Sequence, residues 1–165
     1  MRPVWTGPDA GNPVRLTASV IAEVISGARE RLLLLSFTSY KVPQVMDALG
    51  AAAAGGVSVD IVLDRAIDNP DHLRFDEASR FAALDGVRVW HWPTDQRPPE
   101  GGTLHAKAVV ADGRVTLVTS ANLTGRALSD NIELGLLVHD PATAGDITAH
   151  IAGLMREGIL ARIEP

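Results

Sequence analysis

The stretch Leu104-His105-Ala106-Lys107-Ala108-Val109-Val110-Ala111-Asp112, followed by Thr119-Ser120-Ala121-Asn122, decides most of the fold and of the chemistry. Two apolar runs flank Asp112-Gly113, a dipeptide that strongly favours a two-residue β-hairpin turn. We therefore expect strands over Leu104–Ala111 and Val115–Ser120, paired antiparallel across this turn. Such pairing would bring the polar residues of both strands onto neighbouring positions of one sheet.

Polar side chains at these positions suit phosphate chemistry. His105 and Lys107 are two residues apart, so on a strand both would leave the same face. A lysine ammonium neutralises phosphoryl oxygens, and an imidazole attacks phosphorus or moves a proton. Ser120 and Asn122 repeat the spacing and offer a hydroxyl and an amide to a tetrahedral anion, while Glu133 supplies a carboxylate that could hold one imidazole nitrogen.

Alternating helical and strand patterns surround this stretch and predict an α/β fold. Helical spacing and short apolar runs indicate a central mixed, largely parallel sheet with helices on both faces. We expect helices over Leu16–Glu30, Val42–Ala54, Leu73–Leu84 and from Pro141 to about Met155, and further strands over Leu32–Phe37, Val57–Leu63, Val87–Trp92 and Asn131–His139. Asp64-Arg65, at a strand end, is expected to form a structural ion pair.

Composition limits the class of protein. The 165 residues fit one domain, 1–165, and 46% hydrophobic residues suffice for a core without cysteine, of which there is none. No apolar run is long enough to cross a bilayer and no signal-peptide run is present, so we expect a cytoplasmic protein without membrane contact. The net charge of −5 means that any polyanion would have to be met by a local basic site.

The motif itself resembles a known family. His105-x-Lys107, Asp112 and Ser120-x-Asn122 match the HxKxxxxDxxxxxxGSxN signature of the phospholipase D superfamily, and residues 131–135 resemble the segment downstream of the signature in that family. One departure is Thr119, where the family usually has glycine. The resemblance implies a phospholipase D-like fold and phosphodiester hydrolysis through a phosphohistidine intermediate, without a cofactor or a metal.

The resemblance also implies a role for each motif residue. His105 becomes the nucleophile, Lys107 the phosphate clamp and Glu133 the group that orients the histidine. Ser120 and Asn122 become phosphate ligands. Asp112, at the turn, is expected to support local structure, and Arg126 is a candidate for contact with a substrate backbone.

The family mechanism uses two motif copies, whereas this chain has one. We therefore expect a homodimer that brings two His105 residues together at the subunit interface. The leading interpretation is a metal-independent nuclease directed at DNA; the alternatives are a phospholipase or small-phosphodiester hydrolase, or a catalytically idle nucleic-acid-binding subunit of a defence complex. A finer resemblance of residues 5–9 and 36–40 to the phospholipase D-like protein of DISARM anti-phage systems implies a role in bacterial defence, with other defence-system proteins as partners.

Overall fold

A computed structural model describes residues 1–165 apart from 9–10, 12–13, 41, 71–72, 74–75 and 165. Its elements, in chain order, are β1 (Arg2–Thr6), β2 (Arg15–Leu16), α1 (Thr17–Gly27), β3 (Arg31–Ser36), β4 (Ser39–Tyr40), α2 (Pro43–Ala54), β5 (Ser58–Leu63), α3 (Ala78–Ala82), β6 (Val87–His91), the 3-10 helix η1 (Thr94–Gln96), β7 (Ala108–Ala111), β8 (Val115–Thr119), β9 (Leu123–Thr124), α4 (Gly125–Ser129), β10 (Glu133–His139), α5 (Pro141–Arg156) and β11 (Ala161–Ile163).

One nine-stranded sheet runs through the molecule in the order β11-β6-β5-β3-β7-β8-β10-β1-β2. The predicted mixed sheet is confirmed, although it is less parallel than expected. Parallel pairs join β3 to β5, β5 to β6 and β1 to β2, and the other neighbours are antiparallel. The strands of the second half of the chain pair antiparallel with their neighbours, β7 with β3, β8 with β7, β10 with β8 and β11 with β6, and this part accounts for the difference.

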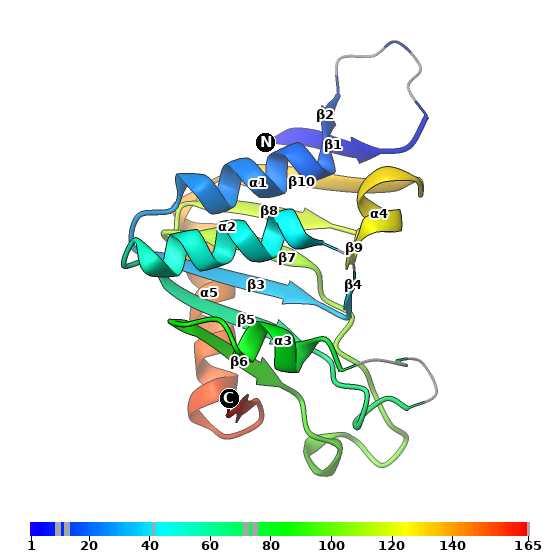
Figure 1. Ribbon diagram of the computed structural model, residues 1–165, viewed down its shortest axis with the longest axis vertical. Helices are drawn as coiled ribbons and strands as arrows, with labels where there is room; N and C mark the ends of the chain where they lie inside the picture. The colour runs from blue at the N-terminus through cyan, green and yellow to red at the C-terminus, as the bar shows by residue number, and fades with distance from the viewer. Residues whose placement is uncertain (9–10, 12–13, 41, 71–72, 74–75, 165) are drawn as a thin grey trace.

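Helices cover both faces of the sheet, as the sequence predicts. Figure 1 shows α1 and α2 in front of the sheet and α5 behind it. The central strand β3 has to be apolar on both sides in this arrangement. Leu32 and Leu34 pack into the core beneath α1 and α2, whereas Leu33 and Leu35 pack into the cluster that includes Ile147 and Ile151 of α5.

The β7–β8 hairpin has the predicted turn. Asp112 and Gly113 have φ values of 54° and 60°, and the N–H of Arg114 donates to the carbonyl oxygen of Ala111 at 3.0 Å. Two successive positive φ values are typical of a type I′ turn, whose twist matches that of the strands. Aspartate tolerates this backbone better than most residues other than glycine.

Several predicted boundaries are wrong, and one of them concerns the site. Strand β7 begins only at Ala108, and residues 101–107 have no regular secondary structure, so His105 and Lys107 precede the strand. Ser120 and Asn122 likewise lie beyond the end of β8. The helix expected over Leu73–Leu84 is reduced to α3; residues 74–75 of that expected helix lie outside the described residues.

The strands at the two edges of the sheet were not predicted from the sequence. Strands β1, β2 and β11 were not expected, and neither was α4. β1 pairs with β10 from the opposite end of the chain, and β11 pairs with β6 at the far edge. Short strands of this kind carry little periodicity, so only their partners define them.

Gly135 compensates for the family departure at Thr119. The two residues are opposite each other in the antiparallel pair β8–β10. A Cβ placed on Gly135 would lie 2.8 Å from the carbonyl oxygen of Val118 and 3.0 Å from the Cβ of Thr119. The β-branched residue therefore fits on β8 because its neighbour on β10 has no side chain.

We predict that Gly135→Ala lowers the free energy of unfolding by about 1–3 kcal/mol, since the added methyl group meets backbone that has little room to move. The matched control is Gly145→Ala on α5, where no atom lies within 4 Å of the added Cβ. That change should leave stability equal or raise it by about 0.5–1 kcal/mol, because alanine favours a helix. Urea unfolding measures both, and equal stability of the two variants would contradict the prediction.

Candidate functional site

The motif residues gather at one end of the sheet, where β3 and β8 finish and β7 and β10 begin. Antiparallel pairing of β7 with β8 and of β8 with β10 brings these ends together. The N–H of Thr119 donates to the carbonyl oxygen of Lys107 at 3.1 Å and so extends the β7–β8 ladder by one bond. Segments far apart in sequence thereby supply one shared polar edge.

Lys107 is a buried cation in contact with an exposed imidazole. Its side chain donates from Nζ to His105 Nδ1 at 3.1 Å and to the His105 carbonyl oxygen at 2.8 Å, and the residue is only 7% exposed. Burial lowers the pKa of Lys107, and the negative charge of Glu133 partly opposes this effect. The ring of His105 lies 6.0 Å from that of Phe37, measured between centroids. The site thus pairs a poorly solvated ammonium with an accessible nitrogen base.

The carboxylate of Glu133 accepts hydrogen bonds from Ser120 and Asn131. Ser120 Oγ donates to Glu133 Oε2 at 2.5 Å and accepts from the N–H of Leu134 at 3.1 Å. Asn131 Nδ2 donates to the other carboxylate oxygen at 3.1 Å. Among the described residues, Glu133 makes no hydrogen bond to His105, whose Nδ1 contacts Lys107 instead. Orientation of His105 by Glu133 therefore stays a prediction.

Asn122 and its neighbours are held from behind by the end of β3. The Oδ1 atom of Asn122 is buried and has no hydrogen-bond partner within the described part of the chain. Ser36 Oγ donates to the carbonyl oxygen of Thr38 at 2.7 Å and accepts from the N–H of Leu123 at 3.1 Å. This fully buried serine, together with the β4–β9 pair, fixes the segment that carries Asn122.

Arg126 is linked to the site by a backbone hydrogen bond. It is exposed, in the short helix α4, and its carbonyl oxygen accepts from the N–H of Asn131 at 2.9 Å. Asn131 in turn holds Glu133. Contact between the Arg126 guanidinium and a substrate stays a prediction.

Asp112 belongs to the motif but acts at the other end of the hairpin. Its carboxylate accepts from the N–H groups of Arg29, Glu30 and Arg31, with N–O distances of 2.8–3.2 Å. Burial raises the pKa of Asp112, but the hydrogen bonds from Arg31, Glu30 and Arg29 outweigh this effect, so the net pKa is lowered. These contacts tie the β7–β8 turn to the α1–β3 turn.

Sequence reasoning missed the supports of the site. The expected ion pair Asp64–Arg65 does not form: Asp64 binds Arg97 at 2.5 Å, and Arg65 binds Asp76 at 2.7 Å. Neighbours in sequence point in different directions at a strand end, so adjacency was a poor guide. The contact of Phe37 with His105 was also missed. Its position directly after the buried strand β3, which ends at the site, is the sequence feature that could have indicated it.

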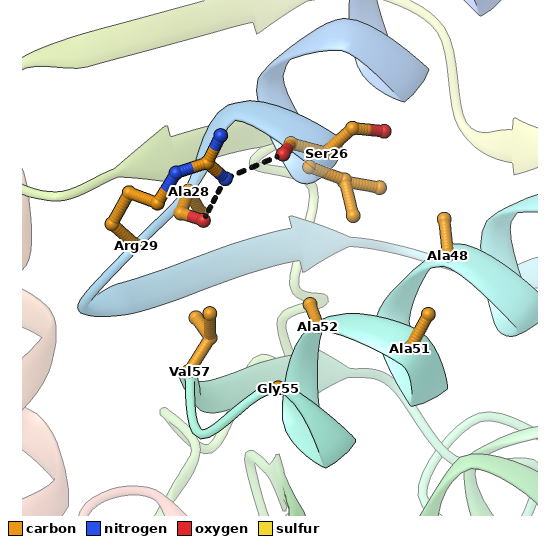
Figure 2. Close-up of a pocket in the computed structure, with 9 residues that line it drawn as sticks. Ser26, Ala28, Arg29, Ala48, Ala51, Ala52, Gly55 and Val57 are labelled. Atoms are coloured by element: carbon orange, nitrogen blue, oxygen red, sulfur yellow. Dashed lines mark hydrogen bonds between the residues drawn. The ribbon is translucent and has the colours of Figure 1, made fainter.

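A pocket away from the motif residues is lined mainly by small apolar side chains. Figure 2 shows the pocket between the C-terminal ends of α1 and α2, lined mainly by small side chains such as Ala48 and Ala51. Its one charged residue, Arg29, donates to the carbonyl oxygens of Ser26 and Ala28, each at 2.9 Å. Over the described ranges, no three His, Asp or Glu residues are grouped so as to hold a metal ion.

Comparison with known proteins identifies the family of the chain. The family model "Cardiolipin synthase, PLD-like domain" matches residues 21–155. Cardiolipin synthase A of Erwinia tasmaniensis is 32% identical over 148 residues, which cover 87% of this chain and 28% of the relative. The chain thus spans little more than a quarter of that curated relative.

Solved structures share the fold along most of the chain. Nuc from Salmonella typhimurium, a phospholipase D family member, superposes with a TM-score of 0.74 at 20% identity and covers 99% of this chain and 97% of its own. NucT from Helicobacter pylori gives 0.71 at 17% identity, with 84% and 87% covered.

The chain belongs to the phospholipase D-like family. The predicted fold is confirmed, and the predicted phospholipase D-type enzyme is confirmed at the level of the family. Within the described residues, no helix is long and apolar enough to cross a membrane.

We predict that Asp112→Asn destabilises the fold by about 1–3 kcal/mol at neutral pH, since hydrogen bonds to a charged acceptor are the stronger ones. The folded-state pKa of Asp112 is lowered, so its contribution is present above the unfolded value of about 3.9 and is lost as the pH falls through the folded value. The stability difference between the two proteins should therefore shrink in urea titrations as the pH falls below about 3.9. A difference that is independent of pH would contradict this account.

Proposed function

We propose that this chain is a metal-independent phosphodiesterase that cleaves nucleic acid, with His105 as nucleophile. The observation that carries the proposal is the buried ammonium of Lys107 placed 3.1 Å from the exposed imidazole of His105. A desolvated cation binds phosphoryl oxygens more strongly than a hydrated one. Ser120 and Asn122 lie at the same edge and complete a cradle for a tetrahedral anion.

The contact between Lys107 and His105 links substrate binding to activation. An ammonium only donates, so Nδ1 of His105 accepts, and the proton of the neutral ring then resides on Nε2. Attack through Nε2 requires that proton on Nδ1, and hence requires Lys107 to leave Nδ1. A phosphoryl group competes for the ammonium, so its arrival frees Nδ1 to take a proton from water while the exposed ring loses the Nε2 proton to water.

The chemical sequence has two displacements. His105 forms a bond to phosphorus as the ester P–O bond breaks, and the leaving alkoxide takes a proton from a general acid. Water then attacks the phosphohistidine, gives a proton to the same group, which now acts as a base, and releases His105 as the P–N bond breaks. One chain offers one such histidine, so the acid would be His105 of a second copy.

The proposed dimer surface is an exposed apolar face beside the site. We define it as Val118, Leu134 and Leu136, which are 46%, 56% and 42% exposed. Val118 and Leu136 are opposite each other on β8 and β10, and their sequence neighbours Leu117 and Leu137 are buried on the other side of the sheet. This face adjoins Ser120 and Glu133, so a second copy packed on it by twofold symmetry would lie next to the motif residues.

Nucleic acid is favoured as the substrate because similarity to Nuc extends over nearly the whole of both chains. The name of the cardiolipin synthase relatives supports the alternative, a phospholipid or small-phosphodiester substrate with the same chemistry. The third alternative is a catalytically idle nucleic-acid-binding subunit. A role in anti-phage defence, with other defence proteins as partners, and a cytoplasmic location are parts of the proposal that rest on sequence resemblance and composition.

We predict that cleavage persists in EDTA and falls at least about 1,000-fold in His105→Ala, because the nucleophile is lost. His150→Ala, an exposed histidine on α5, is the matched control and should retain full activity. The assay compares single-stranded DNA, duplex DNA, RNA and phosphatidylglycerol vesicles, so that hydrolysis of lipid alone would favour the alternative. Cleavage that depends on magnesium would contradict the mechanism, and DNA binding without any cleavage would favour the idle subunit.

We predict that Leu136→Glu converts a dimer to a monomer and lowers cleavage at least about tenfold, because a carboxylate would be buried without a partner at the proposed interface. Ile67→Glu, at a residue 72% exposed in the loop after β5, is the control and should stay dimeric. Light scattering measures the mass of each. A wild-type chain that is active as a monomer would refute the shared site.

A further inference from the structure

A buried ion pair lies beside the segment that leads to the site. Arg97 Nη2 and Asp64 Oδ1 are 2.5 Å apart, and the two side chains are only 3% and 0% exposed. Removing both charges from water is costly, and a buried pair of this kind adds little to stability over an apolar pair of similar volume. A specific geometric role is therefore the better explanation for its presence.

The guanidinium of Arg97 donates hydrogen bonds to backbone carbonyl oxygens of several segments. It donates to the carbonyl oxygen of Trp92 from Nε at 3.0 Å, to that of Gly102 at 2.7 Å and to that of Asp68 at 3.3 Å. The Trp92 ring lies against it, with 5.3 Å between Cζ and the ring centroid. Arg97 thus ties both ends of the loop 92–102 to the segment after β5.

The carboxylate of Asp64 also binds the backbone of Leu104, the residue before His105. Asp64 Oδ2 accepts from the N–H of Leu104 at 3.2 Å. Residues 101–107 form no strand; after Leu104, the His105 carbonyl oxygen accepts from Lys107 Nζ at 2.8 Å, and the Lys107 carbonyl oxygen accepts from the N–H of Thr119 on β8. His105 is therefore suspended between an anchor on Asp64 and an anchor on β8.

We propose that Arg97 and Asp64 are positioning residues that set the imidazole of His105 against Lys107 through the backbone of Gly102–Leu104. Neither residue touches the reacting atoms. Their effect on turnover rests on the proposed phosphodiesterase function, whereas their effect on the placement of His105 does not. Displacing a nucleophile by about 1 Å can cost on the order of 100-fold in rate, so this support is sufficient to matter.

The test compares Arg97→Gln with Arg88→Gln. Arg88 is the matched control because it also forms a two-contact pair with an aspartate, Asp60, at 2.8 and 2.6 Å, but between β5 and β6 and not in the loop. We expect Arg97→Gln to lower kcat roughly 10- to 100-fold with KM changed less than about threefold, since phosphate ligands stay in place while the nucleophile moves. Arg88→Gln should leave both constants within about twofold.

A second readout does not need activity. The side-chain NMR signals of His105, assigned with His105→Ala, should shift or broaden in Arg97→Gln and stay unchanged in Arg88→Gln. A wild type without any cleavage would refute the proposed function and leave this readout valid. If Arg97→Gln does not fold, Asp64→Asn, which keeps the shape of the side chain, takes its place with the same expected outcomes. Unchanged His105 signals together with an unchanged kcat would overturn the proposal.

Discussion

The backbone hydrogen bond from Thr119 N–H to the Lys107 carbonyl oxygen sets the relation between the two halves of the site. On one side of it are the imidazole and the ammonium, and on the other are the hydroxyl and the amide. The register of the β7–β8 hairpin decides which residues share that bond. A shift of one position would turn the side chains of the segment that carries Lys107 to the opposite face relative to the residues of β8 and β10, and so would separate Lys107 from Ser120 and Glu133. The site is therefore a product of strand register before it is a product of side-chain chemistry.

That register is secured at the far end of the hairpin. The positive φ values at Asp112 and Gly113 close a two-residue turn, and the Asp112 carboxylate fastens the turn to the start of β3. The aspartate of the motif thus supports the candidate site from a distance. It holds the hairpin against the central strand, while the histidine and lysine lie at the opposite end.

Sequence patterns predicted those elements whose apolar spacing or turn residues match their burial in the structure. The long helices, the doubly buried β3 and the turn at Asp112 were predicted because periodicity and turn residues are local signals. The path of residues 101–107 was not, since it depends on the contacts of Asp64 and Arg97 with distant backbone. The sequence spacing predicted that His105, Lys107, Ser120 and Glu133 lie near one another. It did not predict which of them form hydrogen bonds with each other. Glu133 holds Ser120 in this chain, which spacing alone does not reveal.

The order of strands also has a consequence for how the chain is made. β3 is covered on one edge by β5, which comes soon after it in the chain, and on the other by β7, which is synthesised more than seventy residues later. Until residues 108–111 leave the ribosome, the apolar strand Arg31–Ser36 presents an open edge. Open apolar edges invite pairing with other chains. The nascent first half should accordingly be prone to pairing with other chains until the segment that carries His105 and Lys107 emerges and β7 covers this edge.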